Sequence, residues 1–299
     1  MTAPAPSLER DSLERDVASP AGIDLARYPV DRLDGADAAA LVERCRAQLA
    51  EDGCVVLPRF LDAATRDRVA AESAALAPEA FYNDTRTNPW SGPGDPAKPA
   101  DHPQNRFADR RNAFVAADRI GAETAIRRLY HDAGFKAFLA RVLGMERLYE
   151  YGDPLAHLVV NVLPPGAQHP WHYDSNAFIV TMLTRKAEAG GTFDYAPRLR
   201  SESDENIDGV RRVLDGDRAA VKTLDLEPGG LQIFYGRHSL HRVSPVEGSV
   251  SRLSVIFAYA PEPGLMSSPA RTRTLFGRIA PEHAAMARET GNGDDAPAA

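Results

Sequence analysis

The half of the chain after Tyr149 is a succession of short apolar runs separated by turn residues. Several short strands joined by turn signals are typical of a sandwich or a barrel. A polar segment, residues 202–217, interrupts the runs and is predicted to form a helix over the barrel, with its acidic part, 202–208, facing solvent. The predicted strands are residues 157–163, 177–183, 190–195, 231–235 and 253–259.

The half before Tyr149 is predicted to be mainly helical. Residues 36–51 carry apolar side chains at helical spacing, and Gly53 ends the pattern before a short strand at 54–57. A second helix is expected at 63–76 after the capping residue Asp62. Two further helices are predicted at 123–132 and 133–143.

Residues 78–112 differ in composition from the helical segments around them. They are rich in Pro, Gly, Asn and Asp, and they contain Phe81, Tyr82 and Trp90. A loop this long is usually either disordered or functional. The three aromatic side chains favour a lid over a disordered segment.

Composition limits the cellular compartment in which we expect the protein and the kinds of molecule that it can bind. The formal charge is −7, and no block of Lys and Arg is interleaved with aromatic residues, so we expect no nucleic-acid partner. No apolar run reaches the ~18 residues of a membrane span, and the acidic N-terminus does not resemble a signal peptide. We therefore expect a cytoplasmic protein with no membrane contact. Cys45 and Cys54 are interpreted as reduced, buried thiols that bind no metal.

Two histidines and one aspartate form the candidate metal site. His172 and Asp174 are two residues apart, so on one strand both side chains point to the same face. His241 follows 67 residues after Asp174. Two imidazoles and one carboxylate are the facial triad of non-haem Fe(II) oxygenases, which leaves three iron positions open. His238 competes with His241 as the distal ligand, but the Val-x-Pro-Val segment that follows favours His241.

Arg252 stands eleven residues after His241, at the start of an apolar strand. On an inward-facing position, its guanidinium can form a bidentate pair with the far end of a dicarboxylate. The alternative is an ordinary surface residue of a strand. Its spacing from the candidate ligands favours the first interpretation.

Taken together, these motifs resemble the 2-oxoglutarate/Fe(II)-dependent oxygenase superfamily, whose fold is a double-stranded β-helix, or jelly roll. More narrowly, the chain is similar over about residues 110–259 to free amino-acid radical halogenases and related hydroxylases. The segments that carry this similarity are 153–155, 161–162, 171–174, 190–195 and 236–243. The halogenases have Gly where this chain has Asp174, and that Gly vacates an iron position for chloride. The resemblance with Asp174 present therefore implies hydroxylation.

Other residues are candidates for binding the co-substrate or the substrate. Asn161, in mid-strand, is a candidate for contact with 2-oxoglutarate, with a purely structural role as the alternative. The candidates for substrate contact are His169, Arg110, Arg111, Ser175 and Trp171. A basic pair such as Arg110 and Arg111 is usually a solvated face, and Trp171 is more typical of a packed core.

The expected fold class is α+β, with a jelly-roll core and N-terminal helices packed on one sheet. One catalytic domain, 21–288, is expected to comprise a helical part (about 36–148) and the core (about 149–259), between tails 1–20 and 289–299. The expected activity is hydroxylation of an unactivated C–H bond in a small polar molecule, such as a free amino acid. The reaction would use Fe(II), O2 and 2-oxoglutarate, and it would release succinate and CO2. The alternatives are desaturation, cyclisation or epimerisation by the same chemistry, or a metal-binding jelly-roll protein without turnover. The oligomeric state is left open.

Overall fold

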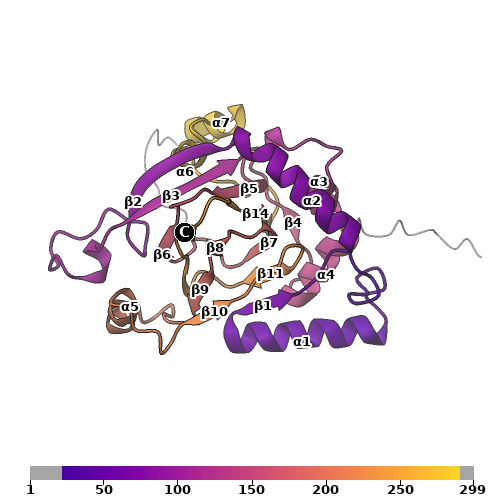
Figure 1. Ribbon diagram of the computed structural model, residues 1–299, viewed down its shortest axis with the longest axis horizontal. Helices are drawn as coiled ribbons and strands as arrows, with labels where there is room; N and C mark the ends of the chain where they lie inside the picture. The colour runs from indigo at the N-terminus through magenta and orange to yellow at the C-terminus, as the bar shows by residue number, and fades with distance from the viewer. Residues whose placement is uncertain (1–21, 290–299) are drawn as a thin grey trace, which may run out of the picture.

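A seven-stranded antiparallel sheet is the largest element of the computed structural model, which describes residues 22–289 (Figure 1). In spatial order its strands are β1 (Cys54–Leu57), β11 (Leu231–Phe234), β7 (Ile179–Arg185), β14 (Arg252–Phe257), β5 (Leu158–Leu163), β3 (Ala108–Val115) and β2 (Phe81–Thr87). The predicted strands 157–163, 177–183 and 231–235 each match one strand with ends shifted by a few residues. The predicted strand 190–195 is divided between Ala189–Gly190 and Phe193–Ala196, and 253–259 is divided between Arg252–Phe257 and Tyr259–Ala260.

A second, four-stranded antiparallel sheet consists of β10 (Lys222–Leu224), β9 (Phe193–Ala196), β12 (Leu240–Val243) and β6 (His169–His172). The two sheets pack on each other through aromatic side chains: the Phe234 ring lies 5.2 Å from that of Phe193 and 5.6 Å from that of Tyr195. Two small pairs complete the strands: β13 (Val246–Glu247) with β8 (Ala189–Gly190), and β15 (Tyr259–Ala260) with β4 (Tyr149–Glu150). The molecule therefore combines helices with a large antiparallel sheet, as predicted.

N-terminal helices cover one face of the large sheet. They are α1 (Ala36–Asp52), α2 (Ala63–Leu76), α3 (Ala125–His131) and α4 (Ala133–Leu143). In β14 the apolar residues Leu253, Val255 and Phe257 belong to the core shared with these helices. Because side chains alternate along a strand, Arg252 and Ser254 face the other way, toward the small sheet. This alternation directs polar side chains into the space between the sheets.

Local sequence signals account for the helix boundaries. The Asp62 side chain accepts a hydrogen bond of 2.7 Å from the Thr65 amide at the start of α2. Asp132 caps α4 in the same way through the Phe135 amide, also at 2.7 Å. The helix boundaries predicted at 63–76 and 133–143 are confirmed.

The prediction of one long loop over 78–112 is wrong at both ends. Residues 81–87 and 108–115 form β2 and β3, which pair from Phe81 opposite Phe114 to Thr87 opposite Ala108. β2 is a polar edge strand with mostly exposed side chains, so it lacks the apolar alternation that identifies a strand in sequence. Only 88–107 connects the strands irregularly, with a 3-10 turn at Pro103–Asn105. Two other such turns are Ala77–Glu79 and Ala117–Arg119.

The irregular 88–107 segment packs on the insertion that carries α5 (Ile207–Leu214). Trp90 Nε1 donates to Glu205 at 2.7 Å, and Arg106 forms an ion pair with Asp215. The helix predicted within 202–217 is thereby confirmed for 207–214, with Asn206 as its cap.

Two C-terminal helices, α6 (Pro269–Phe276) and α7 (Pro281–Glu289), lie beside β2 and β3 (Figure 1). Phe276 packs on Phe114 with ring centroids 6.3 Å apart. The predicted tail 1–20 lies outside the described residues, as does the predicted tail 289–299 except for Glu289, which is the last residue of α7. Among residues 22–289, no helix has both the length and the apolar character needed to cross a bilayer. Cys45 and Cys54 are free and buried, as predicted.

Candidate active site

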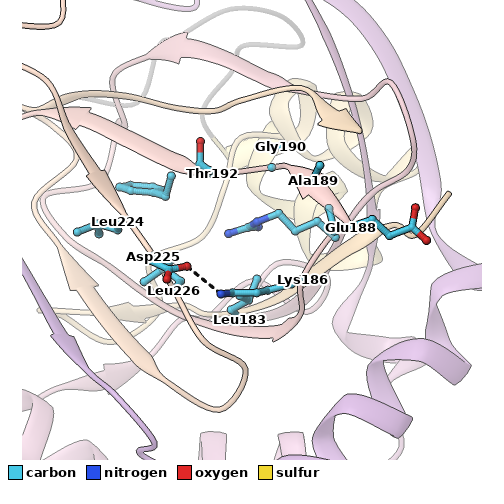
Figure 2. A pocket seen from close by; sticks show the side chains of 13 residues that line it. Leu183, Lys186, Glu188, Ala189, Gly190, Thr192, Leu224, Asp225 and Leu226 are labelled. Atoms are coloured by element: carbon cyan, nitrogen blue, oxygen red, sulfur yellow. Dashed lines mark hydrogen bonds and ion pairs between the residues drawn. The ribbon is translucent and has the colours of Figure 1, made fainter. Parts of the chain in front are cut away.

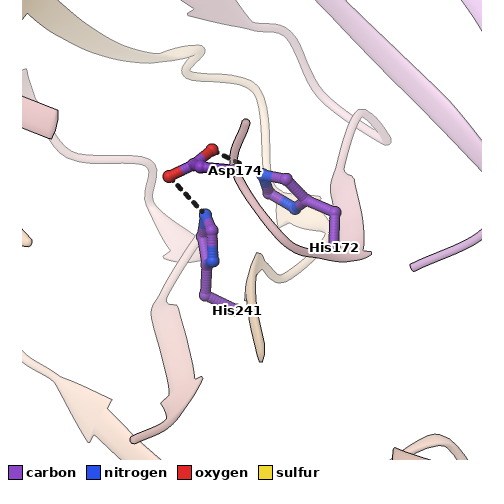
Figure 3. A group of neighbouring side chains, drawn as sticks. All are labelled: His172, Asp174 and His241. Atoms are coloured by element: carbon purple, nitrogen blue, oxygen red, sulfur yellow. Dashed lines mark ion pairs between the residues drawn. The ribbon is translucent and has the colours of Figure 1, made fainter. Parts of the chain in front are cut away.

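The structure brings the three candidate metal ligands together (Figure 3). His172 ends β6 and His241 lies directly opposite it on the neighbouring strand β12. The ligand atoms of these histidines and Asp174 all lie within 4.8 Å of one another. Nε2 of His172 is 3.7 Å from Asp174 Oδ1, and Nε2 of His241 is 3.4 Å from Asp174 Oδ2. His238, the alternative to His241, is outside this cluster.

Asp174 is positioned differently from the sequence prediction. Strand β6 ends at His172, so Asp174 lies in the following loop and not on the same strand. Its amide donates to the Gly236 carbonyl at 3.1 Å, and its carboxylate occupies space beside Gly236. A Cβ at position 236 would lie 1.9 Å from Asp174 Oδ2, so the missing side chain of Gly236 makes room for the carboxylate.

Both histidines are oriented by backbone carbonyls. His172 Nδ1 is 2.9 Å from the Pro170 oxygen, and His241 Nδ1 is 2.9 Å from the Ser239 oxygen. Because a carbonyl only accepts, these partners assign the proton to Nδ1 and leave an Nε2 lone pair on each ring. Asp174 Oδ2 is buried and has no donor among residues 22–289. Lone pairs and a carboxylate that face one another repel, and a divalent cation between them would turn this repulsion into coordination.

The protonation states suit metal binding. Burial, and then the nearby His241, lower the pKa of His172 to about 3. Burial by itself would raise the pKa of Asp174, but the adjacent His241 and His172 lower it to about 2. At neutral pH the site therefore offers a neutral imidazole and an ionised carboxylate, the forms that ligate a metal.

Arg252 borders a cavity of about 180 Å³ next to this cluster (Figure 2). Arg252 is 5% exposed, and within residues 22–289 its guanidinium donates one hydrogen bond, of 3.3 Å, to Ser254 Oγ. Burial lowers the pKa of Arg252 to about 10, which still leaves it charged at neutral pH. The other cation of the cavity, Lys186, is neutralised by Asp225 at 2.8 Å and Glu227 at 2.5 Å. Arg252 is thus the cation of this cavity that lacks a carboxylate partner among the described residues.

The cavity and the histidine cluster are neighbours through Phe193. The Phe193 side chain lines the cavity, and its ring centroid lies 5.7 Å from that of His241. Gly191 also lines the cavity, and a Cβ there would lie 3.1 Å from Arg252 Cδ. The glycine therefore leaves room for the stem of the Arg252 side chain.

Two buried asparagines face the same interior. Asn161 on β5 lies opposite Ser254 of β14, and its Oδ1 has no hydrogen-bond partner among residues 22–289. Asn112 on β3 is fully buried, and neither atom of its amide has such a partner. Buried amides are normally satisfied, so both are candidates for contact with a bound molecule. Asn161 was predicted from sequence, whereas Asn112 was not.

The predicted substrate residues separate into two groups. The His169 ring stacks on His172 at 3.6 Å, and burial lowers its pKa well below the ordinary value. Arg110 has a buried Nε without a partner, and burial followed by the charge of Arg271 lowers its pKa to about 10. Arg111, by contrast, is exposed and paired with Asp84 at 3.1 Å, so it points away from the site.

The remaining two predicted residues have structural contacts. Trp171 packs in the cluster that joins the small sheet to α5, with the Arg242 guanidinium 4.8 Å from its ring, in agreement with the packing alternative. The Ser175 carbonyl accepts a 2.6 Å hydrogen bond from Arg237, which holds the loop after Asp174.

Sequence reasoning missed Asn112. For Asn112 a signal existed, because it is two residues from Arg110 and therefore on the same face of a strand, but the strand itself was predicted as loop.

Comparisons with known proteins agree with this geometry. The family model of halogenase D (HalD) matches residues 99–274, which is more than half of the chain. No curated protein matches the chain.

Several solved structures are similar to this chain at low identity. The epimerase SnoN from nogalamycin biosynthesis, in complex with Fe3+, alpha ketoglutarate and nogalamycin RO, is 17% identical with a TM-score of 0.51, covering 82% of this chain and 98% of its own. A second SnoN structure is 16% identical with a TM-score of 0.51, covering 74% and 83%. An oxidoreductase of the 2OG-Fe(II) oxygenase family from Burkholderia pseudomallei is 18% identical with a TM-score of 0.48, covering 75% and 92%.

At these identities the two SnoN structures show likeness of fold alone. The motifs had indicated a resemblance to 2-oxoglutarate/Fe(II)-dependent oxygenases and, within them, to radical halogenases, and the family match agrees with both. Because the family model spans more than half of its length, the chain belongs to the halogenase D family.

Proposed function

We propose that this protein is an Fe(II)- and 2-oxoglutarate-dependent oxygenase that hydroxylates an unactivated C–H bond of a small polar substrate, such as a free amino acid or a derivative. The observation that carries the proposal is the set of facing ligand atoms: two Nε2 lone pairs and one carboxylate within 4.8 Å, beside a buried, unpaired Arg252. SnoN, which shares the fold, is described with both Fe3+ and alpha ketoglutarate.

Each residue has a definite role in this proposal. His172, Asp174 and His241 would hold Fe(II) and leave positions open for the co-substrate and O2. Arg252 would pair with the far carboxylate of 2-oxoglutarate in the 180 Å³ cavity, and Asn161 would contact the same molecule. Bound iron, with 2-oxoglutarate and O2, supplies the oxidising power for C–H cleavage.

The protein contributes orientation and charge. The carbonyls of Pro170 and Ser239 fix both imidazoles so that each Nε2 faces the iron position. His169, which stacks on His172, and Arg110, whose buried Nε has no partner among the described residues, would contact the substrate. Substrate placement then decides which carbon is oxidised.

Asp174 favours hydroxylation over halogenation, although the family is named for a halogenase. The resembling halogenases have Gly at this position, whereas the carboxylate of Asp174 would occupy the iron position that chloride needs. We further propose the double-stranded β-helix connectivity for the two facing sheets, and one catalytic domain over residues 21–288.

The proposal is tested in two steps, iron binding first and turnover second. Anaerobic protein is first titrated with Fe(II), and succinate and product mass are then measured with 2-oxoglutarate and O2 over a panel of free amino acids. Succinate and a product heavier by one oxygen are expected for at least one amino acid. His241→Ala should lose iron, while the matched control His238→Ala should keep it.

Other results would select the alternatives. A product of unchanged mass would favour epimerisation, and a product lighter by two hydrogens would favour desaturation or cyclisation. Iron binding without succinate would favour a metal-binding protein without turnover. Full activity of the His241→Ala protein would refute the ligand assignment.

A further inference from the structure

Asp174 is the one candidate ligand that is not held by regular structure. His172 and His241 lie opposite each other on paired strands. Asp174 lies in the loop between the end of β6 and the start of β7. Its carboxylate faces the Nε2 lone pairs of the two histidines, and its Oδ2 has no donor among residues 22–289. Because these groups repel one another, contacts outside the ligand set have to keep the Asp174 side chain turned toward them.

Gly236 and Arg237 contact the loop on both sides of Asp174. The Gly236 carbonyl accepts a hydrogen bond of 3.1 Å from the Asp174 amide. Nη2 of Arg237 donates to the Ser175 carbonyl at 2.6 Å. Between these two hydrogen bonds lie the backbone dihedral angles of only two residues, Asp174 and Ser175. Holding both ends therefore restricts the direction in which the Asp174 side chain can point.

The Arg237 guanidinium has no other acceptor in the described part of the chain. The Ser175 carbonyl is its one hydrogen-bond partner within residues 22–289, and its Nε is buried without a partner. A half-buried charge with so few partners is unfavourable, so an apolar side chain would fill this corner at lower cost. What the guanidinium adds is a charged donor, which makes a stronger hydrogen bond to a carbonyl than a neutral donor does.

Arg200 holds Arg237 from the side away from the loop. Its Nε donates to the Arg237 carbonyl at 2.8 Å. Its guanidinium carbon also lies 4.0 Å from the centroid of the Tyr173 ring. Tyr173 is the residue between the ligands His172 and Asp174. The Arg200 side chain therefore contacts both the segment that holds the ligand loop and the middle residue of the ligand motif.

The segment 88–107 contacts the same residues. Glu205 pairs with Arg200 at 3.1 Å and accepts a 2.7 Å hydrogen bond from Trp90 Nε1. The Trp90 ring centroid lies 5.9 Å from that of Tyr173, and the Tyr173 amide donates at 2.8 Å to the carbonyl of the residue before Trp90. Trp90 and Arg200 thus both pack on Tyr173, which fixes the ligand motif from outside the small sheet.

On the basis of the proposed function, we propose that Arg237 is the positioning residue for the ligand Asp174, and that Arg200 holds Arg237 in place. Arg237 keeps the carboxylate directed at the iron position before iron binds, so binding does not have to order the loop. Residues that support metal ligands typically contribute about 10–100-fold to metal affinity. Arg237 acts one residue away from the ligand, so we expect Arg237→Met to weaken metal binding by about ten-fold, and Arg200→Met by less.

Metal titration without turnover tests this proposal. Anaerobic metal-free protein is titrated with Co(II), whose visible absorption depends on the number and type of its ligands, and Fe(II) affinity is measured by competition. Arg237→Met should bind Co(II) about ten-fold more weakly and shift the Co(II) spectrum toward that of the Asp174→Ala protein. Arg237→Lys keeps the charge and a donor, so it should bind Co(II) more tightly than Arg237→Met. This order separates the hydrogen bond from side-chain packing.

Arg185 provides the matched control. It is also half-buried, and its Nε donates to a backbone carbonyl, that of Ser251, at 2.9 Å. It is the last residue of β7, whereas the ligand loop precedes the first. Arg185→Met should therefore change Co(II) affinity by less than about two-fold. Thermal melting of the metal-free proteins checks that each variant folds.

A double-mutant cycle shows whether Arg237 acts through Asp174. In the Asp174→Ala background, Arg237→Met should cause no further loss of Co(II) affinity, because the ligand that Arg237 positions is already gone. If Arg237→Met does not fold, Arg237→Lys takes its place in the same cycle.

Several results would overturn the inference. Wild-type Co(II) affinity and spectrum in Arg237→Met would do so, as would an equal loss of Co(II) affinity with and without Asp174. Unchanged metal affinity together with weaker amino-acid binding would assign Arg237 to the substrate instead. Failure of the wild-type protein to bind either Co(II) or Fe(II) would refute the proposed function, and this inference with it.

Discussion

Asn112→Leu should stabilise the ligand-free protein, contrary to the usual effect of a substitution in the interior. Asn112 is 0% exposed and neither its Nδ2 nor its Oδ1 has a partner among the described residues. A buried polar group left unsatisfied costs about 1–3 kcal/mol. Leucine has the same branching without the polar atoms, so we expect the free energy of unfolding to rise by about 1–3 kcal/mol. For a chain of this size, that corresponds to roughly 2 °C in melting temperature per kcal/mol.

Asn88 is the matched control for this experiment. It is also buried, at 1%, but its amide is fully used: Oδ1 accepts from the amides of Trp90 and Gly92, and Nδ2 donates to the carbonyls of Gly92 and Gln104. Asn88→Leu should therefore lower the free energy of unfolding, because it orphans these groups.

Urea unfolding of the metal-free proteins measures both changes, with unchanged m-values as the check that the folded state is intact. Saturating Fe(II), 2-oxoglutarate and substrate should then stabilise wild type more than Asn112→Leu. If Asn112→Leu and Asn88→Leu lose similar stability, Asn112 is satisfied in the free protein and the reasoning is wrong.

Two further predictions concern charge and titration. Arg252→Gln should weaken 2-oxoglutarate binding by about 2–5 kcal/mol, or roughly 30-fold to several thousand-fold in affinity, while Lys186→Gln, which removes a cation already paired, should weaken it much less. Calorimetry on the anaerobic Fe(II) protein measures both affinities. An unchanged 2-oxoglutarate affinity in Arg252→Gln would show that another cation binds the co-substrate. Burial raises the pKa of Cys45 to about 11 and that of Cys54 to about 12. Both thiols should resist iodoacetamide at pH 8 in folded protein and react in urea, and rapid labelling of either in folded protein would contradict their burial. The stability that these protonated thiols contribute is complete below the ordinary thiol pKa of 9.0 and is lost as the pH rises through about 11 and 12.

The parts of the fold that follow local rules were predictable from sequence. Asp62 begins α2 where capping chemistry places it, and the apolar runs around Val160 and Val255 lie in the large sheet. The pairing of β2 with β3 was not predictable, because the polar strand Phe81–Thr87 gains its conformation from its partner and not from its own pattern. Asn112 was missed for the same reason. The side of the sheet to which its side chain points can be predicted only after β3 is recognised as a strand.

The ligands of the candidate metal site were predictable because they lie in short sequence motifs. His172 and Asp174 are two residues apart in the sequence, and the segment after His241 singled out that histidine. The contacts that orient the two histidines were not predictable. They come from the backbone carbonyls of Pro170 and Ser239, and a backbone carbonyl leaves no signal in the pattern of side chains. The buried contact between His283 of α7 and Asp153 was not predictable either, because the two residues are 130 positions apart in the sequence.

Substitutions at Asp174 and Gly236 test whether the site favours hydroxylation over halogenation. The φ of Gly236 is not in the left-handed region, so space is what requires glycine: a Cβ there would lie 1.9 Å from Asp174 Oδ2. Gly236→Ala alone should displace the carboxylate, weaken Fe(II) binding and destabilise the protein by about 1–3 kcal/mol.

Asp174→Gly removes the group that Gly236 accommodates, so the two substitutions should be strongly non-additive. In the Asp174→Gly background, Gly236→Ala should cost little further stability, and denaturant unfolding of the four proteins in this cycle measures the coupling. Asp174→Gly itself opens one iron position and removes one negative charge, so chloride becomes admissible. Because the pocket has not been shaped for chloride, we expect loss of most hydroxylation and at best a minor chlorinated product, with succinate formed without matching product. Additive effects would show that Gly236 does not accommodate the Asp174 carboxylate, and chlorination as the main reaction of the wild-type protein would refute Asp174 as an iron ligand.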